Sequence, residues 1–372
     1  MRQTKDLYIG LMSGTSVDAV DAVLVRIGTK LELRASLNFD IPTDLKNQIH
    51  EVCTAEQVSM DDLGRLNRQM GDLFADATLT LLSRVGVSAK EICAIGSHGQ
   101  TIRHRPPSAS EPSPFTWQIG DPHVITARTE ITTVADFRSR DLAEGGHGAP
   151  LAPLFHLALC HNLTESCGVL NIGGLANLTV IDQDQVRHGF DTGPGNTLID
   201  AWYRHHNTGD FDKGGSWACT GAIDLKLLKQ WLNDPYFSKA PPKSTGREYF
   251  NSNWVVAQSP HVETLPPADV AATLVELTAV SAGRSIRESL RKNQSVYVCG
   301  GGAHNTFLLS RLQNQLPNNN LENIEKLGIG PDWIEAAAFA WLAHARLQDQ
   351  RFDLSRITGS KGQVPLGVIY PA

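Results

Sequence analysis

Short apolar runs separated by turns of glycine and polar residues dominate the start of the chain. Residues 7–12 and 22–25 are apolar and flank a Gly-Thr-Ser turn. Apolar runs bounded by such turns are typical of strands joined in hairpins. The pattern therefore predicts a β-meander over residues 7–37. The same shape returns at residues 169–181, where a Gly-Gly turn separates two apolar runs.

Further periodic segments alternate between helix-like and strand-like spacing. We predict helices over 44–53, 61–85, 121–128, 151–161, 196–203, 306–316 and 331–351. We predict strands over 92–96, 132–135, 185–190 and 295–299, and a surface loop over the Pro/Ser-rich residues 105–114. The polar, glycine-rich stretch 136–150 favours a crossover between two domains, and the tail should return to the first. The expected domains are 1–137 plus 350–372 (domain I) and 138–349 (domain II).

The first hairpin turn has the composition of a phosphate-binding loop. Glycine and hydroxyl residues can present several N–H and O–H donors to a phosphate. Its candidate residues are Gly14, Thr15, Ser16, Val17, Asp18, Ala19, Val20 and Asp21. Carboxylates beside a phosphate require a cation such as Mg²⁺ to offset their charge. A plain hairpin turn is the alternative for this segment taken alone.

Three glycine-rich elements together resemble the sugar kinase/Hsp70/actin superfamily. They are the hairpin at residue 14, the hairpin at residue 173, and a strand that enters a Gly-Gly-Gly loop at residue 300. The resemblance implies an α/β protein of two RNase H-like domains with an interdomain nucleotide cleft. It also implies that the hairpins hold the phosphates and that the late loop lies along the adenosine. The residues so implied are Gly173, Gly174, Asn177, Gly300, Gly301, Gly302 and Asn305.

Composition narrows the possible partners and the compartment. The 372 residues are 41% hydrophobic and 19% charged, with a net charge of −6. This balance is ordinary for a globular protein, and without a basic stripe it argues against nucleic-acid binding. No run of 18 apolar residues and no signal peptide is seen, so we expect no membrane association. Six cysteines without a C-x-x-C pair favour reduced thiols in the cytoplasm.

Asp191 is the strongest candidate for a catalytic base. It lies between a predicted strand and a predicted helix and precedes Gly-Pro-Gly. A carboxylate at a strand end is placed where α/β sheets bind ligands, on a support rigid enough to orient it toward a water or a hydroxyl. Capping of the following helix is the alternative role.

Other polar residues suit ligand contacts, each with a structural alternative. Glu335 shares one face of the last long helix with apolar residues, so its carboxylate needs a partner. It either orders Mg²⁺-bound water or pairs with an arginine. The alternative is a structural glutamate in the first turn that the helix dipole stabilises. Arg138 either clamps a substrate carboxylate or forms an interdomain salt bridge. His98 and Gln100, in an expected strand-end loop, suit sugar hydroxyls or a structural role. His205 and His206 are interpreted as helix-dipole partners rather than ligands.

With these pieces placed, the chain resembles the anhydro-N-acetylmuramic acid kinase family over nearly its full length. The matching segments are 10–16, 96–101, 118–120, 134–138, 148–151, 171–174, 190–196, 243–248, 299–305 and 335–340. Two positions depart from the family pattern. Ala19 replaces a usual glycine and would be strained if its φ were positive, and His147 replaces a usual glutamine.

This resemblance implies a reaction and residue roles. ATP and water would convert 1,6-anhydro-N-acetylmuramic acid to N-acetylmuramic acid 6-phosphate in bacterial cell-wall recycling. Asp191 would take the proton of the attacking water, with Glu335 as the second catalytic carboxylate. Asp18 and Glu335 would hold Mg²⁺ through water, and a homodimer is expected. The residues expected to contact the sugar are His98, Gln100, Thr101, Arg138 and Asn196.

Three rival functions fit parts of the same pattern. The first is a kinase of the same superfamily that phosphorylates an ordinary sugar hydroxyl or a carboxylate. The second is a non-catalytic nucleotide clamp, which would be expected to carry a long substrate-binding extension. The third is a phosphohydrolase that splits ATP without an acceptor.

Overall fold

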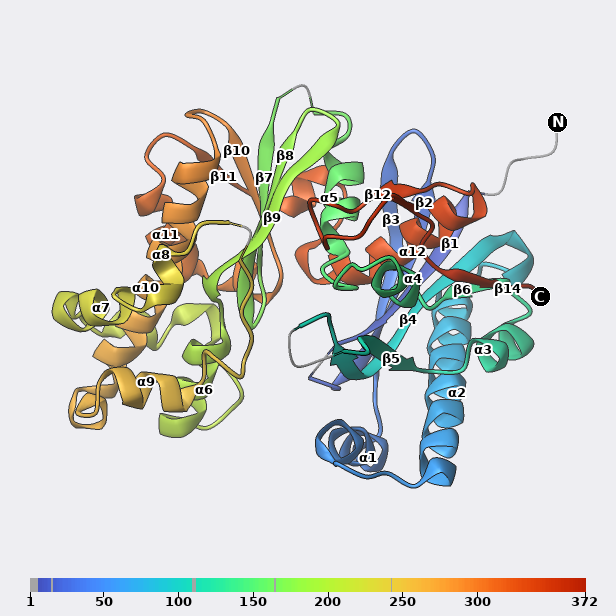
Figure 1. Ribbon diagram of the computed structural model, residues 1–372, viewed down its shortest axis with the longest axis horizontal. Helices are drawn as coiled ribbons and strands as arrows, with labels where there is room; N and C mark the ends of the chain where they lie inside the picture. Colours follow the sequence, from blue (N-terminus) through green and yellow to red (C-terminus); the bar gives the residue numbers. More distant parts are fainter. Residues whose placement is uncertain (1–5, 15, 109–111, 164, 242) are drawn as a thin grey trace. The chain divides into compact units, whose positions relative to one another are not determined.

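The computed structural model describes residues 6–14, 16–108, 112–163, 165–241 and 243–372, and its backbone divides into two compact units (Figure 1). Unit 1 contains Met1–Phe155 and Trp333–Ala372, and unit 2 contains His156–Asp332. A separate cluster of buried apolar side chains fills each unit. The chain therefore starts and ends in unit 1, with unit 2 as one continuous insertion.

Unit 1 is built on a seven-stranded mixed sheet in the order β14-β6-β4-β1-β2-β3, with β5 paired to β4. Its strands are β1 (Leu7–Ser13), β2 (Ala19–Ile27), β3 (Leu31–Asp40), β4 (Ile92–Arg105), β5 (Phe115–Ile119), β6 (Thr133–Ala135) and β14 (Val368–Tyr370). Its helices are α1 (Thr43–Thr54), α2 (Met60–Val85), α3 (Pro122–Thr129), α4 (Ser139–Ala143) and α12 (Ile334–Leu347). A small ribbon of β12 (Phe352–Asp353) and β13 (Gln363–Val364) precedes β14.

Unit 2 is built on a five-stranded sheet in the order β11-β10-β7-β8-β9. Its strands are β7 (Cys167–Ile172), β8 (Leu175–Asp182), β9 (Gln185–Pro194), β10 (Ser295–Cys299) and β11 (Asn320–Asn323). Its helices are α6 (Thr197–His206), α7 (Leu225–Leu232), α8 (Pro235–Ser238), α9 (Ser252–Gln258), α10 (Pro267–Ser289) and α11 (Thr306–Gln315). Helix α5 (Ala152–Cys160) spans the boundary between the units.

The two sheets share one strand order, which confirms the predicted fold class. In each, three consecutive strands pair antiparallel and a later strand pairs parallel to the first of them. A further strand, β6 or β11, then extends the sheet in parallel. The units are thus two α/β domains of RNase H-like order. Each begins with a hairpin whose turn contains glycine.

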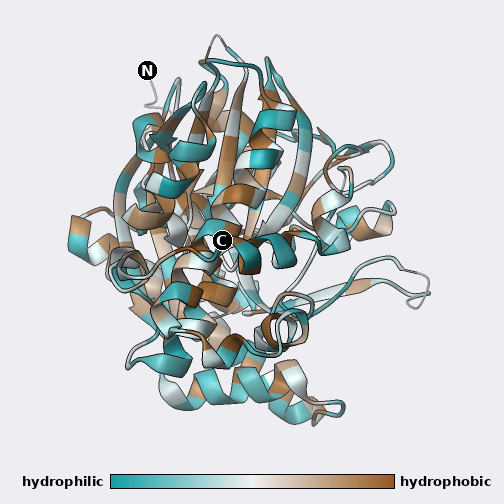
Figure 2. Ribbon diagram, turned by 90° about the vertical axis from the view of Figure 1, so that its left-hand side faces the viewer, coloured by the Kyte–Doolittle hydropathy of each residue, from teal (hydrophilic) through white to brown (hydrophobic). Residues whose placement is uncertain are grey.

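Hydropathy follows this architecture. In Figure 2 hydrophobic colour concentrates on the strands, while the helices carry both hydrophobic and hydrophilic turns. Such amphipathic helices bury one face and leave the other in water. Among the described residues, no helix has the combined length and apolar character needed to cross a bilayer.

The division between the units differs from the expected domain boundaries, because 138–155 and 333–349 belong to unit 1. The glycine-rich stretch is held in unit 1 by the buried Asp141 carboxylate. This carboxylate accepts hydrogen bonds from Gly148 N (2.6 Å) and from Thr358 Oγ1 (2.7 Å). A carboxylate without exposure requires such donors, and they tie the stretch to the C-terminal tail. The expected return of the tail is confirmed, since β14 pairs with β6.

Strand β4 is longer than predicted. It includes His98 and Gln100, which we expected in a loop at the end of the strand. The register with β1 shifts between the pairs Leu11–Ser97 and Ser13–Gln100, so β4 holds one extra residue there. Gly99 adopts a φ of 79° at this β-bulge. Gly99 interrupts the apolar pattern, but it allows the β-bulge and does not end the strand. Similarly, β9 continues through Asp191 to Pro194.

Helix α12 lies directly on the sheet of unit 1 at two paired glycines. Gly10 of β1 and Gly96 of β4 are opposite each other in the register. A Cβ at Gly10 would fall 1.9 Å from Ala336 O, and one at Gly96 would fall 1.9 Å from Phe339 O. Only glycine allows this approach. It fixes the start of α12, and with it Glu335, against the interior of β1 and β4.

Candidate active site

The first hairpin turn carries an unusual backbone at Val17. Val17 N donates to Gly14 O (3.2 Å), and its φ of 56° lies in the left-handed region. This conformation is rare for a β-branched residue, and strained backbone clusters at functional sites. Ala19 instead begins β2, so the strain that a positive φ would cause does not arise there. Thr15 lies outside the described residues.

Both candidate carboxylates of this hairpin have protein partners. Asp18, which is exposed, forms an ion pair with Lys46 of α1, and this lysine is the main cause of the lowered pKa of the Asp18 carboxyl. Asp21 Oδ1 accepts a hydrogen bond from Asn38 Nδ2 of β3 (2.8 Å). Carboxylate oxygens suit Mg²⁺, but an ion at Asp18 must share that group with Lys46.

The bulge in β4 positions a buried polar cluster. His98 Nδ1 faces Gly99 O (2.9 Å), and His98 Nε2 lies 3.0 Å from Arg138 Nε. Because an arginine Nε can only donate, His98 Nε2 is the acceptor and the ring is neutral. Burial, followed by Arg138, holds the His98 pKa well below its usual range. Gln100 accepts from Ser13 Oγ (2.6 Å), so both predicted residues are fixed by neighbours.

Arg138 and Glu335 share an electrostatic environment in unit 1. Arg138 Nη1 donates to Gly148 O (2.7 Å), while burial lowers the guanidinium pKa to about 10 against the opposing effect of Glu335 and Asp141. The Glu335 side chain is exposed to solvent at the start of α12. Surrounding protein nevertheless displaces water from the carboxyl, and this desolvation raises the pKa of Glu335. The positive charge of Arg138 opposes that rise.

A cavity of about 210 Å³ opens beside this cluster and contains residues that the sequence analysis missed. His98, Asp136 and Ser139 line it together with Ser97, Trp117 and Tyr370. The buried Ser97 hydroxyl has no hydrogen-bond partner among the described residues. Trp117 is 45% exposed although it is large and apolar. An unused donor and an aromatic surface are what a sugar requires. Trp117 follows the predicted surface loop 105–114, and a single tryptophan there does not by itself indicate a ligand contact.

In unit 2 the second glycine hairpin is tied to the turn that follows β9. Gly195 N and Thr197 N donate to Gly174 O (2.9 and 3.0 Å), and Asn196 N donates to Gly173 O (2.8 Å). These bonds lock the β7–β8 turn onto the start of α6. Two polypeptide turns, both rich in glycine, therefore form one rigid surface.

The triple-glycine loop packs against the end of β7 in the same unit. Gly300 has a φ of 76°, and a Cβ there would fall 2.3 Å from Asn171 Oδ1. A Cβ on Gly301 would lie 3.8 Å from Asn196 Nδ2, so this loop adjoins the turn before α6. Asn305 Oδ1 accepts from Leu308 N (2.9 Å) and caps α11. That carbonyl oxygen is thus occupied by a structural contact.

Asp191 lies in β9, next to the second hairpin. It pairs in register with Asn177 of the second hairpin, and its Oδ2 accepts from Thr245 N (3.0 Å). Burial raises the Asp191 pKa to about 6, although the Thr245 bond works against the rise. Tyr236 Oη donates to Asp191 O (2.7 Å) and Asp191 N donates to Lys243 O (3.0 Å). A half-buried carboxyl titrating near neutrality, on a braced backbone, suits a general base.

Arg247 is another residue that the sequence patterns did not indicate. A Cβ on Gly174 would lie 3.0 Å from Arg247 Nη2, so the guanidinium stands beside the glycine turn. The side chain is exposed. A positive charge next to a glycine turn suits an anionic ligand. The segment 243–248 lacks the pattern of a phosphate loop, and only the fold brings it to the hairpin.

The predicted site residues therefore divide between the units. His98, Gln100, Thr101, Arg138 and Glu335 belong to unit 1 with the first hairpin, whereas Asp191, Asn196 and the remaining glycine turns belong to unit 2. Together these features define a two-domain α/β enzyme whose glycine turns suit an anionic ligand and whose carboxylates suit a cation or proton transfer. A family model described as anhydro-N-acetylmuramic acid kinase matches residues 6–372. The chain belongs to this family of kinases.

Curated relatives agree along the whole chain. An anhydro-N-acetylmuramic acid kinase of Xylella fastidiosa is 48% identical, covering 98% of this chain and 96% of the relative. One of Coxiella burnetii is also 48% identical, covering 98% of both chains. Among solved structures, a ROK family glucokinase from Streptomyces griseus is 11% identical with a TM-score of 0.39, covering 90% of this chain and 98% of that one.

Proposed function

We propose that the protein is an anhydro-N-acetylmuramic acid kinase. It uses ATP and water to convert 1,6-anhydro-N-acetylmuramic acid to N-acetylmuramic acid 6-phosphate and ADP. The family match over residues 6–372 carries this proposal. The environment of Asp191 supports it, because a carboxyl with a pKa of about 6 is mostly ionised at neutral pH and is a stronger base than an ordinary aspartate.

The substrate dictates an unusual course for a sugar kinase. Its O6 is bonded to C1, so it has no 6-hydroxyl to deprotonate. Water forms a bond to C1 as the C1–O6 bond breaks through an oxocarbenium-like state. Asp191 accepts a proton from that water. The released O6 bonds to the γ-phosphorus as the bond to the β-phosphate oxygen breaks, and ADP leaves.

The glycine turns are the proposed contacts of ATP. Gly14 and Ser16 of unit 1 and Gly174 of unit 2 would bind the phosphates through backbone N–H groups. Gly173 would shape this turn, since its own N–H donates to Leu175 O (3.1 Å). The exposed Arg247 beside Gly174 would add positive charge. The loop Gly300–Gly302 would lie along the adenosine, since its glycines leave no side chains in the way.

The donor set of unit 1 fits a hydrated Mg²⁺. Glu335 is exposed and has no ion-pair partner within the described part of the chain, so it can accept hydrogen bonds from metal-bound water. Asp18 would be the second holder and would share its charge with Lys46. Mg²⁺ when bound would offset the charge of the transferring phosphate.

The cavity lined by Ser97, His98 and Trp117 is the proposed sugar subsite of unit 1. The Ser97 hydroxyl would gain a partner there, and the indole would cover an apolar sugar face. Gln100, Thr101 and Arg138 would complete this side, and Asn196 would contribute from unit 2. Use of ATP implies a cytoplasmic enzyme, consistent with cell-wall recycling. A homodimer stays a prediction that light scattering can test.

The decisive experiment measures ADP release by the purified protein with ATP and Mg²⁺. Reactions would contain 1,6-anhydro-N-acetylmuramic acid, N-acetylmuramic acid, or no sugar. We expect turnover only with the anhydro sugar, and a product with the mass of N-acetylmuramic acid 6-phosphate. Equal turnover with the open sugar would indicate a hydroxyl kinase, and turnover without sugar a phosphohydrolase. ATP binding without turnover would indicate a nucleotide clamp.

A further inference from the structure

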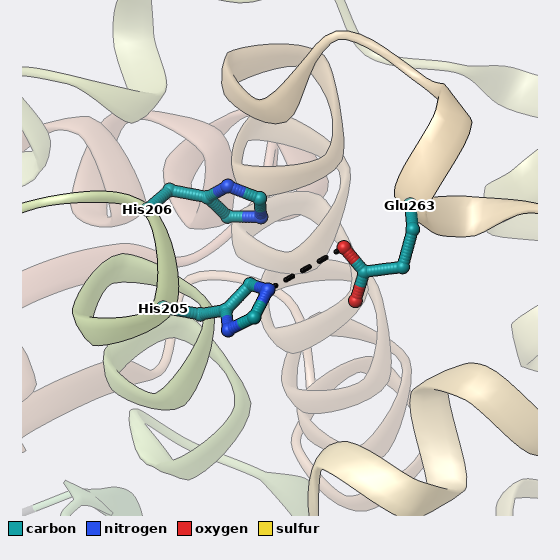
Figure 3. Close-up of side chains that lie close together, drawn as sticks. All are labelled: His205, His206 and Glu263. Carbon is teal, nitrogen blue, oxygen red and sulfur yellow. Dashed lines mark ion pairs between the residues drawn. The ribbon is translucent and has the colours of Figure 1, made fainter.

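A cluster of two histidines and one glutamate lies in unit 2 outside the proposed kinase site. His205 and His206 end α6, and Glu263 belongs to the short 3-10 helix Val262–Thr264. One ligand atom from each residue lies within 4.8 Å of the other two. Figure 3 shows both imidazole rings and the carboxylate facing a common point. We propose that these three residues bind a divalent transition-metal ion such as Zn²⁺.

The strongest sign of a missing partner is at His206. Its Nε2 is buried and forms no hydrogen bond with any residue that the structure describes. A buried polar atom without a partner costs free energy, so it is rarely left unused. A metal ion at the point that the three side chains face would satisfy it.

The remaining two ligands are close to coordination geometry already. His205 Nε2 and Glu263 Oε2 are 3.5 Å apart. Two ligand atoms on a tetrahedral zinc ion are separated by about 3.3 Å for bonds of about 2.0–2.1 Å. The ligand atom of His206 lies within 4.8 Å of both.

The surroundings hold the histidines in place. The Trp202 ring packs against His206, with ring centroids 4.3 Å apart, and the Trp202 indole N–H donates to Pro267 O (2.9 Å). A cavity of about 380 Å³ adjoins the cluster and is lined by Trp202, His205 and Glu263. A fourth coordination position therefore has room for water or a small ligand. Such pre-organisation by neighbours is typical of metal ligands.

The donor set selects the class of metal. Two imidazoles with one carboxylate are a known ligand combination for Zn²⁺ and suit other transition metals of similar softness. Mg²⁺ prefers oxygen ligands only and would not be held here. The site thus differs from the proposed Mg²⁺ contacts in unit 1 and does not depend on the kinase proposal.

Zinc binding by the full-length chain without a histidine tag tests the proposal. The metal-stripped protein would compete with a chromophoric zinc indicator, and Co²⁺ would report tetrahedral geometry by its visible absorption. We expect one Zn²⁺ per chain. His205→Ala and Glu263→Gln should each weaken zinc binding at least about tenfold. Both residues are largely exposed, so the fold should survive, which thermal unfolding without metal would verify.

The matched control is His161→Ala. His161 also lies beside a carboxylate, with Nδ1 3.3 Å from Asp184 Oδ1, but without a third ligand in the described structure. Its zinc affinity should equal that of the unchanged protein. The proposal is overturned if the protein takes up no zinc at equimolar concentration. It is also overturned if the His205 and Glu263 variants bind as tightly as the control.

Discussion

At the scale of single residues, Asp191 combines three properties that a general base needs. Its backbone is held by Tyr236 and Lys243, one carboxylate oxygen is held by Thr245, and burial raises its pKa to about 6. Bracing leaves the second oxygen as the reactive atom. The same burial destabilises the folded protein when the carboxyl is ionised, so Asp191 suits catalysis at a cost in stability.

Asp191→Asn should abolish most of the kinase activity and leave the protein folded. We expect kcat to fall about 100- to 10,000-fold, the usual contribution of a general base. Because the folded pKa is raised, the ionised carboxyl opposes folding above pH 6, and the neutral amide should unfold no more readily. Steady-state rates and urea unfolding measure the two effects. Asp184→Asn, at the far turn of the same β8–β9 hairpin, should retain full activity.

The pH dependence of the reaction should show the same group. The Asp191 carboxyl must be deprotonated to accept a proton, and its pKa is about 6. The value of kcat/KM should therefore fall about tenfold per pH unit below pH 6. A profile that stays flat down to pH 4, where an ordinary aspartate titrates, would contradict the assignment.

Arg138→Lys tests the cluster at the bulge. The substitution keeps the charge but removes the fixed geometry of two donors, one to His98 and one to Gly148. We expect the KM for the anhydro sugar to rise about tenfold or more, with the KM for ATP unchanged. An equal loss for both substrates would point to a general disturbance of unit 1.

At the scale of elements, the contact of α12 with β1 and β4 connects the sheet to Glu335. Gly96→Ala would place a Cβ 1.9 Å from Phe339 O, and a backbone atom cannot rotate away. We expect a loss of about 1–3 kcal/mol of unfolding free energy. Gly28→Ala is the control, because open space surrounds that Cβ and a change within about 0.5 kcal/mol is expected. Urea unfolding compares the variants, and equal stability of the two would refute the packing argument.

How far the sequence predicts these elements depends on what each glycine does. The turns at Gly14, Gly173 and Gly300 interrupt apolar runs where the chain does reverse or leave the sheet, so they were predicted. Gly96 and Gly99 interrupt β4 in the same way, but one admits a helix and the other forms a bulge. Their partners are distant in sequence, and local patterning cannot reveal them. The positions of Arg247 and Trp117 depend on tertiary packing in the same sense.

At the scale of the whole molecule, the chain order predicts different behaviour for the two units. Residues 156–332 contain the whole sheet and core of unit 2, whereas unit 1 needs α12 and β14 from the C-terminal end. A fragment of residues 156–332 should unfold cooperatively in urea, and a fragment of residues 1–155 should not. Circular dichroism during unfolding distinguishes them. Cooperative unfolding of the 1–155 fragment alone would contradict this expectation.

The insertion of one unit into the other also has a consequence for biosynthesis. The sheet surface at Gly10 and Gly96 is translated early, but helix α12, which covers it, emerges only after all of unit 2. At elongation rates of about 5–20 residues per second, that apolar surface waits for roughly ten seconds or more. The nascent chain should therefore be a client of ribosome-associated chaperones, and the last forty residues act as the latch that ends this exposure.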